Sequence, residues 1–255
     1  MIIDPAFVGV GLFIGFLIGM TGVGGGAILA PILIVFFGFK ITAVIVIDLI
    51  FASLTKIFTT FLYASRFAVD WQIVRRLWVG SISSVLIVFI FLFNFGLPDP
   101  TFIKVFLSLM IFLSGLSLVY KGIFIFFNKI IFFRENNNKY LSIGLGGFIG
   151  SSVSLTSIGA GALGTALLAQ IYPKRLDPTK LVGTDIMHAI PVSLMGAVGY
   201  LSMVDIDLTP IPSLLFGSIP GSVIGFLAAF RIPPSTLKYI IGYTLIISSL
   251  SLMLK

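Results

Sequence analysis

Two sets of residues in this sequence are candidates for binding or proton transfer. They are clustered glycines, which leave backbone N–H groups accessible, and ionisable side chains that lie among apolar residues. Residues 19–26 hold five glycines in eight positions, which disfavours an unbroken helix there. A helix that begins after such a break presents free N–H groups and the positive end of its dipole, a combination that binds anions. A second cluster lies at 156–161. The residues expected to bind an anion through N–H or hydroxyl groups are Thr21, Gly22, Gly24, Gly25, Gly26, Thr156, Ser157, Gly159 and Gly161.

Four ionisable residues are candidates for coupling anion movement to another ion: Asp48, Lys56, Asp185 and His188. An aspartate at the centre of a membrane helix costs ~2.5–3.5 kcal/mol on insertion scales, so it needs a compensating role. For Asp48 and Asp185 that role is a proton or sodium site, a structural hydrogen bond, or a side chain that reaches the membrane surface. Lys56 is placed to pair with Asp48, to attract the anion, or to reach the surface. His188 lies one turn after Asp185 and is either a hydrogen-bonded polar residue or a proton relay.

The composition is that of a polytopic membrane protein. Hydrophobic residues make up 58% of the 255 residues and charged residues 10%, with a mean hydropathy of +1.17, whereas a soluble domain carries about 25% charged residues. The absence of cysteine excludes disulfides and thiolate metal sites, and a single histidine argues against a histidine-built metal centre. No ATP-binding motif is present. The sequence therefore predicts no cofactor, no bound metal and no enzymatic activity, and its net charge of +7 indicates basic cytoplasmic loops rather than nucleic-acid binding.

Helices of membrane length must position these residues. The first apolar run, 6–37, would form a straight helix of ~48 Å against ~30 Å of bilayer hydrocarbon, so we expect two short helices that meet at the glycines. Asp4 and Pro5 have the residue types of a helix start. Further spans are expected at 42–64, 77–95 and 102–120, with a loop at 65–76.

The second half of the chain repeats the first. The pattern divides the chain into a first transmembrane repeat (1–133), a polar cytoplasmic linker (134–140) and a second repeat (141–255). The offset is 135 residues at first, and an insertion near residues 174–177 raises it to 137. Matched pairs include Gly15 with Gly150, Thr21 with Thr156, Gly26 with Gly161, Asp48 with Asp185, Tyr63 with Tyr200, and Asp70 with Asp207.

Loop charges indicate how the broken segments sit in the membrane. If each segment crosses once, the two sides of the membrane carry seven and eight lysines and arginines, which is no bias. If each segment enters and leaves on one side, twelve lie on one side and only Lys40, Lys104 and Lys255 on the other. The sequence thus predicts an all-α protein of two inverted repeats, each a broken re-entrant helix hairpin plus three transmembrane helices, with basic loops cytoplasmic and both termini outside. Two short full crossings per broken segment give the same charge pattern.

The glycine-rich segment GFLIGMTGVGGG (15–26), followed by Pro31, resembles the TauE/SafE family of membrane transporters, the sulfite exporter family. Its weaker copy is GSSVSLTSIGAG (150–161), which lacks the triple glycine. The resemblance covers essentially the whole chain. It implies movement of a small sulfur-containing anion, such as sulfite or an organosulfonate, across the inner membrane of a bacterial cell.

Two other functions fit parts of the sequence. An intramembrane aspartyl protease would use Asp48 and Asp185 as a shared-proton pair, although Thr184 replaces the glycine expected before the second aspartate. A passive anion channel would use the same glycine clusters without a coupling ion. The identity of the anion, the direction of transport, the coupling ion (proton or sodium) and the oligomeric state stay open at this point.

Overall fold

The computed structural model describes residues 3–22, 25–64, 68–120, 138–158, 161–172, 174–229, 231 and 234–254, and all the regular secondary structure in these ranges is helical. Within these ranges the helices are α1 (Pro5–Thr21), α2 (Gly26–Val35), α3 (Ile41–Ala64), α4 (Trp71–Phe95), α5 (Pro100–Val119), α7 (Asn138–Thr156), α8 (Ala162–Ile171), α9 (Pro178–Leu201), α10 (Pro210–Ala229) and α11 (Pro234–Leu254). Five of them, α3, α4, α5, α9 and α10, are long and apolar enough to cross a membrane. The predicted all-α membrane class is confirmed. Most of the predicted linker lies outside the described residues, and α7 begins inside it.

Aspartates fix the starts of several helices. The carboxylate of Asp4 accepts a hydrogen bond of 2.8 Å from the N–H of Ala6, which confirms the predicted start of α1 with Pro5 in its first turn. Asp99 and Asp177 cap α5 and α9 in the same way. The expected spans 42–64 and 102–120 correspond closely to α3 and α5.

The predicted loop at 65–76 is wrong in its second half, because α4 already begins at Trp71. The side chain of Asp70 accepts from the N–H groups of Gln72 and Ile73 and so starts the helix six residues before the expected position. The prediction failed because polar and basic residues were assigned to the loop, although they occupy the first turns of the helix.

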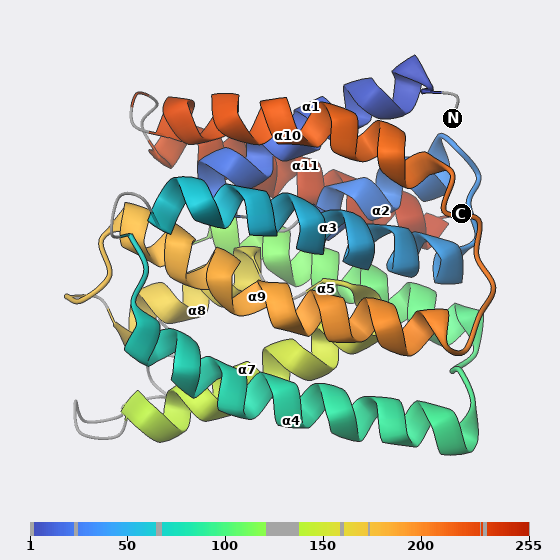
Figure 1. Ribbon diagram of the computed structural model, residues 1–255, viewed down its shortest axis with the longest axis horizontal. Coiled ribbons are helices and arrows are strands. Elements are labelled where there is room, and N and C mark those ends of the chain that lie inside the picture. Colours follow the sequence, from blue (N-terminus) through green and yellow to red (C-terminus); the bar gives the residue numbers. More distant parts are fainter. Residues whose placement is uncertain are drawn as a thin grey trace.

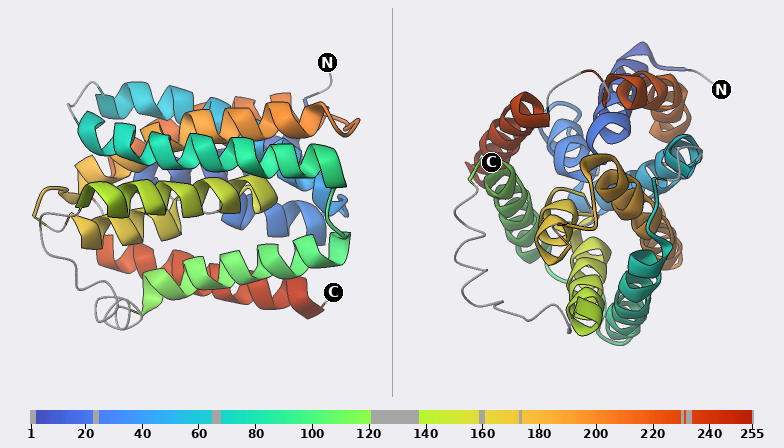
Figure 2. Two further views of the ribbon diagram at one scale, coloured as in Figure 1. Left: turned by 90° about the horizontal axis from the view of Figure 1, so that it is seen from below. Right: turned by 90° about the vertical axis from the view of Figure 1, so that its left-hand side faces the viewer.

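The long helices lie side by side in one bundle (Figures 1 and 2). α3 packs against α9 across the middle, α1 against α10, α4 against α7, and α5 against α11. α1 begins, α2 ends and α3 begins at the end of the bundle where both chain termini are marked in Figure 1. α7 begins, α8 ends and α9 begins at the opposite end.

Glycines bring two of these helix pairs into backbone contact. On α1, a methyl group added to Gly11, Gly15 or Gly19 would overlap the backbone of α10 at Leu214, Ser218 or Ser222. On α7, Gly146 and Gly150 meet the backbone of α4 at Leu77 and Ser81 in the same way. Small residues at such positions let membrane helices approach closely, so these glycines serve packing rather than ligand binding.

Candidate functional site

The first break lies between α1 and α2. Gly22 ends α1 in the left-handed conformation (φ 67°), and its N–H donates to the carbonyl of Ile18 at 2.9 Å. Most residues with a side chain adopt this conformation only at a cost, so glycine suits the position. α2 then begins at Gly26, with Gly25 before it. Gly24 lies outside the described residues.

The second break, between α7 and α8, contains the one residue other than glycine with positive φ in the described part of the chain. That residue is Ser157 (φ 61°), which follows the last residue of α7. A left-handed residue with a side chain costs about 1–2 kcal/mol, so a local interaction must hold it there. Gly161 (φ 127°) precedes α8, and Gly159 lies outside the described residues.

The two breaks meet at the carboxylate of Asp48 on α3. The hydroxyl of Ser157 donates a hydrogen bond to Oδ2 of Asp48, which provides the interaction that the left-handed serine needs. A methyl group added to Gly26 would overlap the same carboxylate and would lie 3.1 Å from the carbonyl oxygen of Ser157. The start of α2, the end of α7 and a buried carboxylate therefore share one point in the bundle.

The predicted coupling residues gather around this point and are all buried. Asp48, Asp185 and His188 are 0% exposed and Lys56 is 2% exposed, so none of them reaches the membrane surface. Lys56 lies within electrostatic reach of both Asp185 and Asp48. The N–H of Gly161, at the start of α8, lies near the carboxylate of Asp185 but makes no hydrogen bond to it.

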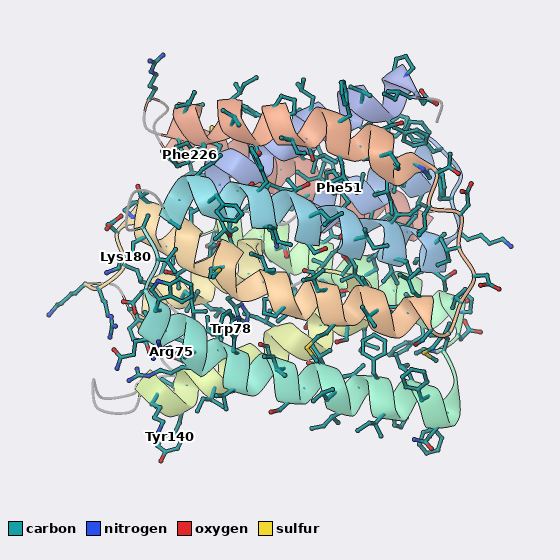
Figure 3. The ribbon with its side chains drawn as sticks, viewed as in Figure 1. Phe51, Arg75, Trp78, Tyr140, Lys180 and Phe226 are labelled. Carbon is teal, nitrogen blue, oxygen red and sulfur yellow. The ribbon has the colours of Figure 1, made fainter. Side chains whose placement is uncertain are left out.

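Several polar atoms of this cluster have no hydrogen-bond partner among the described residues. They are Oδ1 of Asp48, both carboxylate oxygens of Asp185 and Nδ1 of His188. The other ring nitrogen of His188 lies 3.1 Å from the hydroxyl of Ser81, and its carbonyl accepts from the indole of Trp78, which Figure 3 shows between α4 and α9. Buried polar atoms are normally hydrogen-bonded, so such a group of exceptions makes this cluster a candidate site for a proton or a ligand.

The predicted threonine donors are bonded to their own helices in this structure. The hydroxyl of Thr21 donates to the carbonyl of Leu17 at 2.7 Å, and that of Thr156 donates to the carbonyl of Ser152 at 2.7 Å. A hydroxyl engaged in this way must rotate before it can bind an anion. The hydroxyl of Ser157, by contrast, joins the end of α7 to α3.

A charged network that the sequence did not reveal lies at the end of the bundle where α4 begins. Asp70 accepts from Nε and Nη2 of Arg175 at 2.6 and 2.8 Å, and Nζ of Lys180 lies 3.8 Å away. Arg76 donates to the hydroxyl of Tyr172 at 3.0 Å. Figure 3 shows Arg75 and Lys180 at this same end.

Asp70 is held as an anion in this network. Burial raises the pKa of the Asp70 carboxyl, but hydrogen bonds from Arg175 and from the N–H of Ile73, with the charges of Arg175 and Lys180, outweigh burial and leave that pKa below its ordinary value. The signal in the sequence was one acidic residue among basic ones. Its partner, Arg175, is 105 positions away, so only the fold brings them together.

Comparison with known proteins agrees with this architecture. The profile of the family described as "Sulfite exporter TauE/SafE" matches residues 7–252. A protein of Bacillus subtilis (strain 168) named "Probable membrane transporter protein YjnA" is 33% identical over 254 residues, which cover 95% of this chain and 97% of that protein. No solved structure matches the chain. The chain therefore belongs to the TauE/SafE sulfite exporter family of membrane transporters.

Proposed function

We propose that this protein is a secondary transporter that moves a small sulfur-containing anion, sulfite or an organosulfonate, across the cell membrane by alternating access. The family description and the transporter name of the Bacillus relative support the class of function and of substrate. The observation that carries the proposal is the meeting of two helix breaks at a buried charged cluster. Broken helices that meet near the middle of a membrane protein are typical of transporter binding sites.

The helix packing supports two repeats related by a pseudo-two-fold axis. Exchanging the halves turns the α1–α10 pair into α7–α4 and leaves α3–α9 and α5–α11 unchanged, and all these pairs are in contact. Aromatic pairs follow the same rule. Tyr63 packs edge-on against Phe226 with ring centres 4.9 Å apart, and Tyr200 packs edge-on against Phe89 at 5.5 Å.

We further propose that the broken segments are hairpins that enter from opposite faces. α2 and α8 have 10 residues each, which is ~15 Å of helix and half of the bilayer core. In Figure 1, α1 begins and α2 ends at one end of the bundle, whereas α7 begins and α8 ends at the other. The short length of α2 and α8 favours re-entrant hairpins over pairs of short crossings, and in this proposal the basic ends are cytoplasmic and both termini lie outside.

The proposed substrate site lies between the hairpin tips. Backbone N–H groups at the starts of α2 and α8 and the hydroxyls of Thr21, Thr156 and Ser157 bind the anion, with Lys56 as the nearby positive charge. Asp48, Asp185 and His188 form the coupling site. The family assignment favours this function over an intramembrane protease, which uses paired aspartates to cleave peptides.

The network around Asp70 provides the closed gate in this conformation. It ties the α8–α9 connection to the start of α4, beside the second hairpin. Its counterpart in the repeat, Asp207, is exposed at the other end of the bundle and accepts from the N–H of Thr209. Alternating access then consists of opening one end while the other closes.

Flux measurements in proteoliposomes test the proposal. Labelled sulfite and sulfoacetate should enter vesicles that hold the wild-type protein, and replacing Gly25 with leucine should abolish entry, because even a methyl group there lies 3.0 Å from Ile14 and 3.2 Å from Phe51. Gly9→Leu is the matched control, since nothing lies within 4 Å of that position. Unchanged flux in Gly25→Leu would remove the hairpin tip from the mechanism, and flux that ignores every imposed ion gradient would favour a channel.

A further inference from the structure

The carboxylates of Asp48 and Asp185 stand where an anion would be expected, at the starts of the two half-helices. We propose that these two carboxylates occupy the positions at which the anionic substrate binds. Protonation of one carboxylate then frees its position for the substrate. Anion and proton then move together, one for one, so that a monovalent anion is carried without net charge. The inference rests on the proposed transport function and specifies its coupling ion.

The first position is at α2. The carboxylate of Asp48 lies so close to Gly26 that no side chain fits between them, and Gly26 is the first residue of α2. The N-terminal end of a helix attracts negative charge through its free N–H groups and its dipole. The carboxylate also accepts from Ser157, a proposed substrate donor, so an anion must displace Asp48 to use these donors.

The second position is at α8 and corresponds to the first. Gly161 and Asp185 are the counterparts of Gly26 and Asp48 in the predicted repeat, and the N–H of Gly161 lies near the Asp185 carboxylate but makes no hydrogen bond to it. A glycine N-terminus facing a buried aspartate thus occurs once in each half. Both oxygens of Asp185 and Oδ1 of Asp48 lack hydrogen-bond partners among the described residues, so each carboxylate has an oxygen free to take a proton.

The charges at the site balance only without the substrate. In their ordinary ionised forms, the two carboxylates contribute two negative charges and Lys56 contributes one positive charge, and the two helix starts contribute about half a positive charge each. The other titratable group that faces the cluster is His188, and α1, α2, α8 and α10 contain no Asp, Glu, Lys, Arg or His. A bound monoanion leaves one negative charge uncompensated, and two like charges 4 Å apart repel by about 4 kcal/mol at an effective dielectric constant of 20.

A proton on Asp48 or Asp185 removes this repulsion. The neutral carboxyl loses its attraction to the helix start, and the anion takes its place at the N–H groups. On the other side of the membrane the anion leaves, the proton dissociates, and the carboxylate returns to the helix start. Atoms and charge balance, because one proton and one anion bind on one side and both leave on the other.

The test uses proteoliposomes that contain the full chain, a pH-sensitive dye inside, and valinomycin with equal potassium on both sides to hold the membrane potential at zero. Sulfoacetate carries two charges, so the probe is a labelled alkanesulfonate, which carries one. We expect uptake to acidify the interior by one proton per anion, and an outside pH lower by one unit to support about tenfold accumulation.

Asp48→Asn and Asp185→Asn separate coupling from transport. Asparagine is a neutral mimic of the protonated carboxyl, and its oxygen still accepts from Ser157. We expect each variant to exchange labelled for unlabelled sulfonate but to lose accumulation driven by a pH difference, from about tenfold to about onefold. Asp99→Asn, at the exposed start of α5, is the control and should accumulate as the wild type does.

The outcomes distinguish this inference from the proposed function. Wild-type protein that exchanges sulfonate but moves no protons, or that accumulates it with a sodium gradient alone, overturns proton coupling and leaves transport intact. Accumulation in both asparagine variants equal to wild type overturns the role of the carboxylates. Absence of any sulfite or sulfonate exchange in folded wild-type protein refutes the proposed function itself. Because Asp185 accepts no side-chain hydrogen bond, Asp185→Asn keeps the test valid if Asp48→Asn fails to fold.

Discussion

Removing the hydroxyl from Tyr63 should lower stability, whereas removing it from Tyr200, the matched residue in the predicted repeat, should leave stability unchanged or raise it. Both side chains are buried and pack edge-on against a phenylalanine. They differ in the hydroxyl: that of Tyr63 donates to the carbonyl of Gly19 at 2.8 Å, whereas that of Tyr200 has no hydrogen-bond partner among the described residues.

The magnitude follows from that difference. Gly19 lies in the last turn of α1, where helical carbonyls lack partners within their helix, so Tyr63→Phe leaves a buried carbonyl unsatisfied at a cost of about 1–3 kcal/mol. Tyr200→Phe deletes a buried hydroxyl that makes no bond, which should be neutral or stabilise by about 1 kcal/mol. We expect the two variants to differ by about 2 kcal/mol.

Thermal unfolding in one detergent measures the difference. For a chain of this length, about 2 kcal/mol corresponds to a separation of roughly 4–8 °C in Tm, with Tyr63→Phe below the wild type and Tyr200→Phe at or above it. Each variant is the control for the other, because they lose the same atom from equivalent places. Equal shifts, or a lower Tm for Tyr200→Phe, would refute the assigned hydrogen bonding and the reasoning from it.

Two further predictions concern the packing of the bundle and its charged end. Gly15→Leu should lower the yield and Tm of folded protein, because the leucine side chain would overlap the backbone of α10 at Ser218. Gly144→Leu is the control and should lower neither, because nothing lies within 4 Å of that position. Equal behaviour of the two variants would contradict the close contact between α1 and α10. Arg175→Gln should reduce stability at neutral pH by about 1–3 kcal/mol, because it leaves the carboxylate of Asp70 buried with Lys180 as its nearest cation. The pKa of Asp70 lies below its ordinary value, so its stabilising contribution is present above about pH 4 and disappears as the pH falls further. The Tm of Arg175→Gln should therefore fall less on acidification than that of the wild type. Parallel curves of Tm against pH would contradict the pairing of Asp70 with Arg175.

Much of this fold could be predicted because the membrane restricts the choices. A run such as 6–37 is too long for one crossing and too glycine-rich for one helix, so the break between α1 and α2 follows from length and composition. The repeat was predicted because aspartates are costly in apolar segments and stand at matched positions in the two halves of the chain. The start of α4 was misplaced because a capping aspartate within a basic segment looks like loop.

The site was predicted as a set of residues but not as an arrangement. Spacing placed Lys56 two turns from Asp48, yet Lys56 also lies within electrostatic reach of Asp185, on another helix. The contact between Ser157 and Asp48 joins residues 109 positions apart, and no local pattern encodes it. The sequence also suggested free helix ends for the anion, whereas side chains of the protein lie against both.

The glycine contacts between α1 and α10, and between α7 and α4, imply that neither repeat is complete by itself. The first helix of each broken pair packs against a helix from the other half of the chain, so the two halves are intertwined. A fragment that ends at the linker would expose a row of bare glycine backbone to lipid. In the proposed alternating-access mechanism we therefore expect α1 to move with α10 and α7 with α4, so that the moving bodies do not coincide with the predicted repeats.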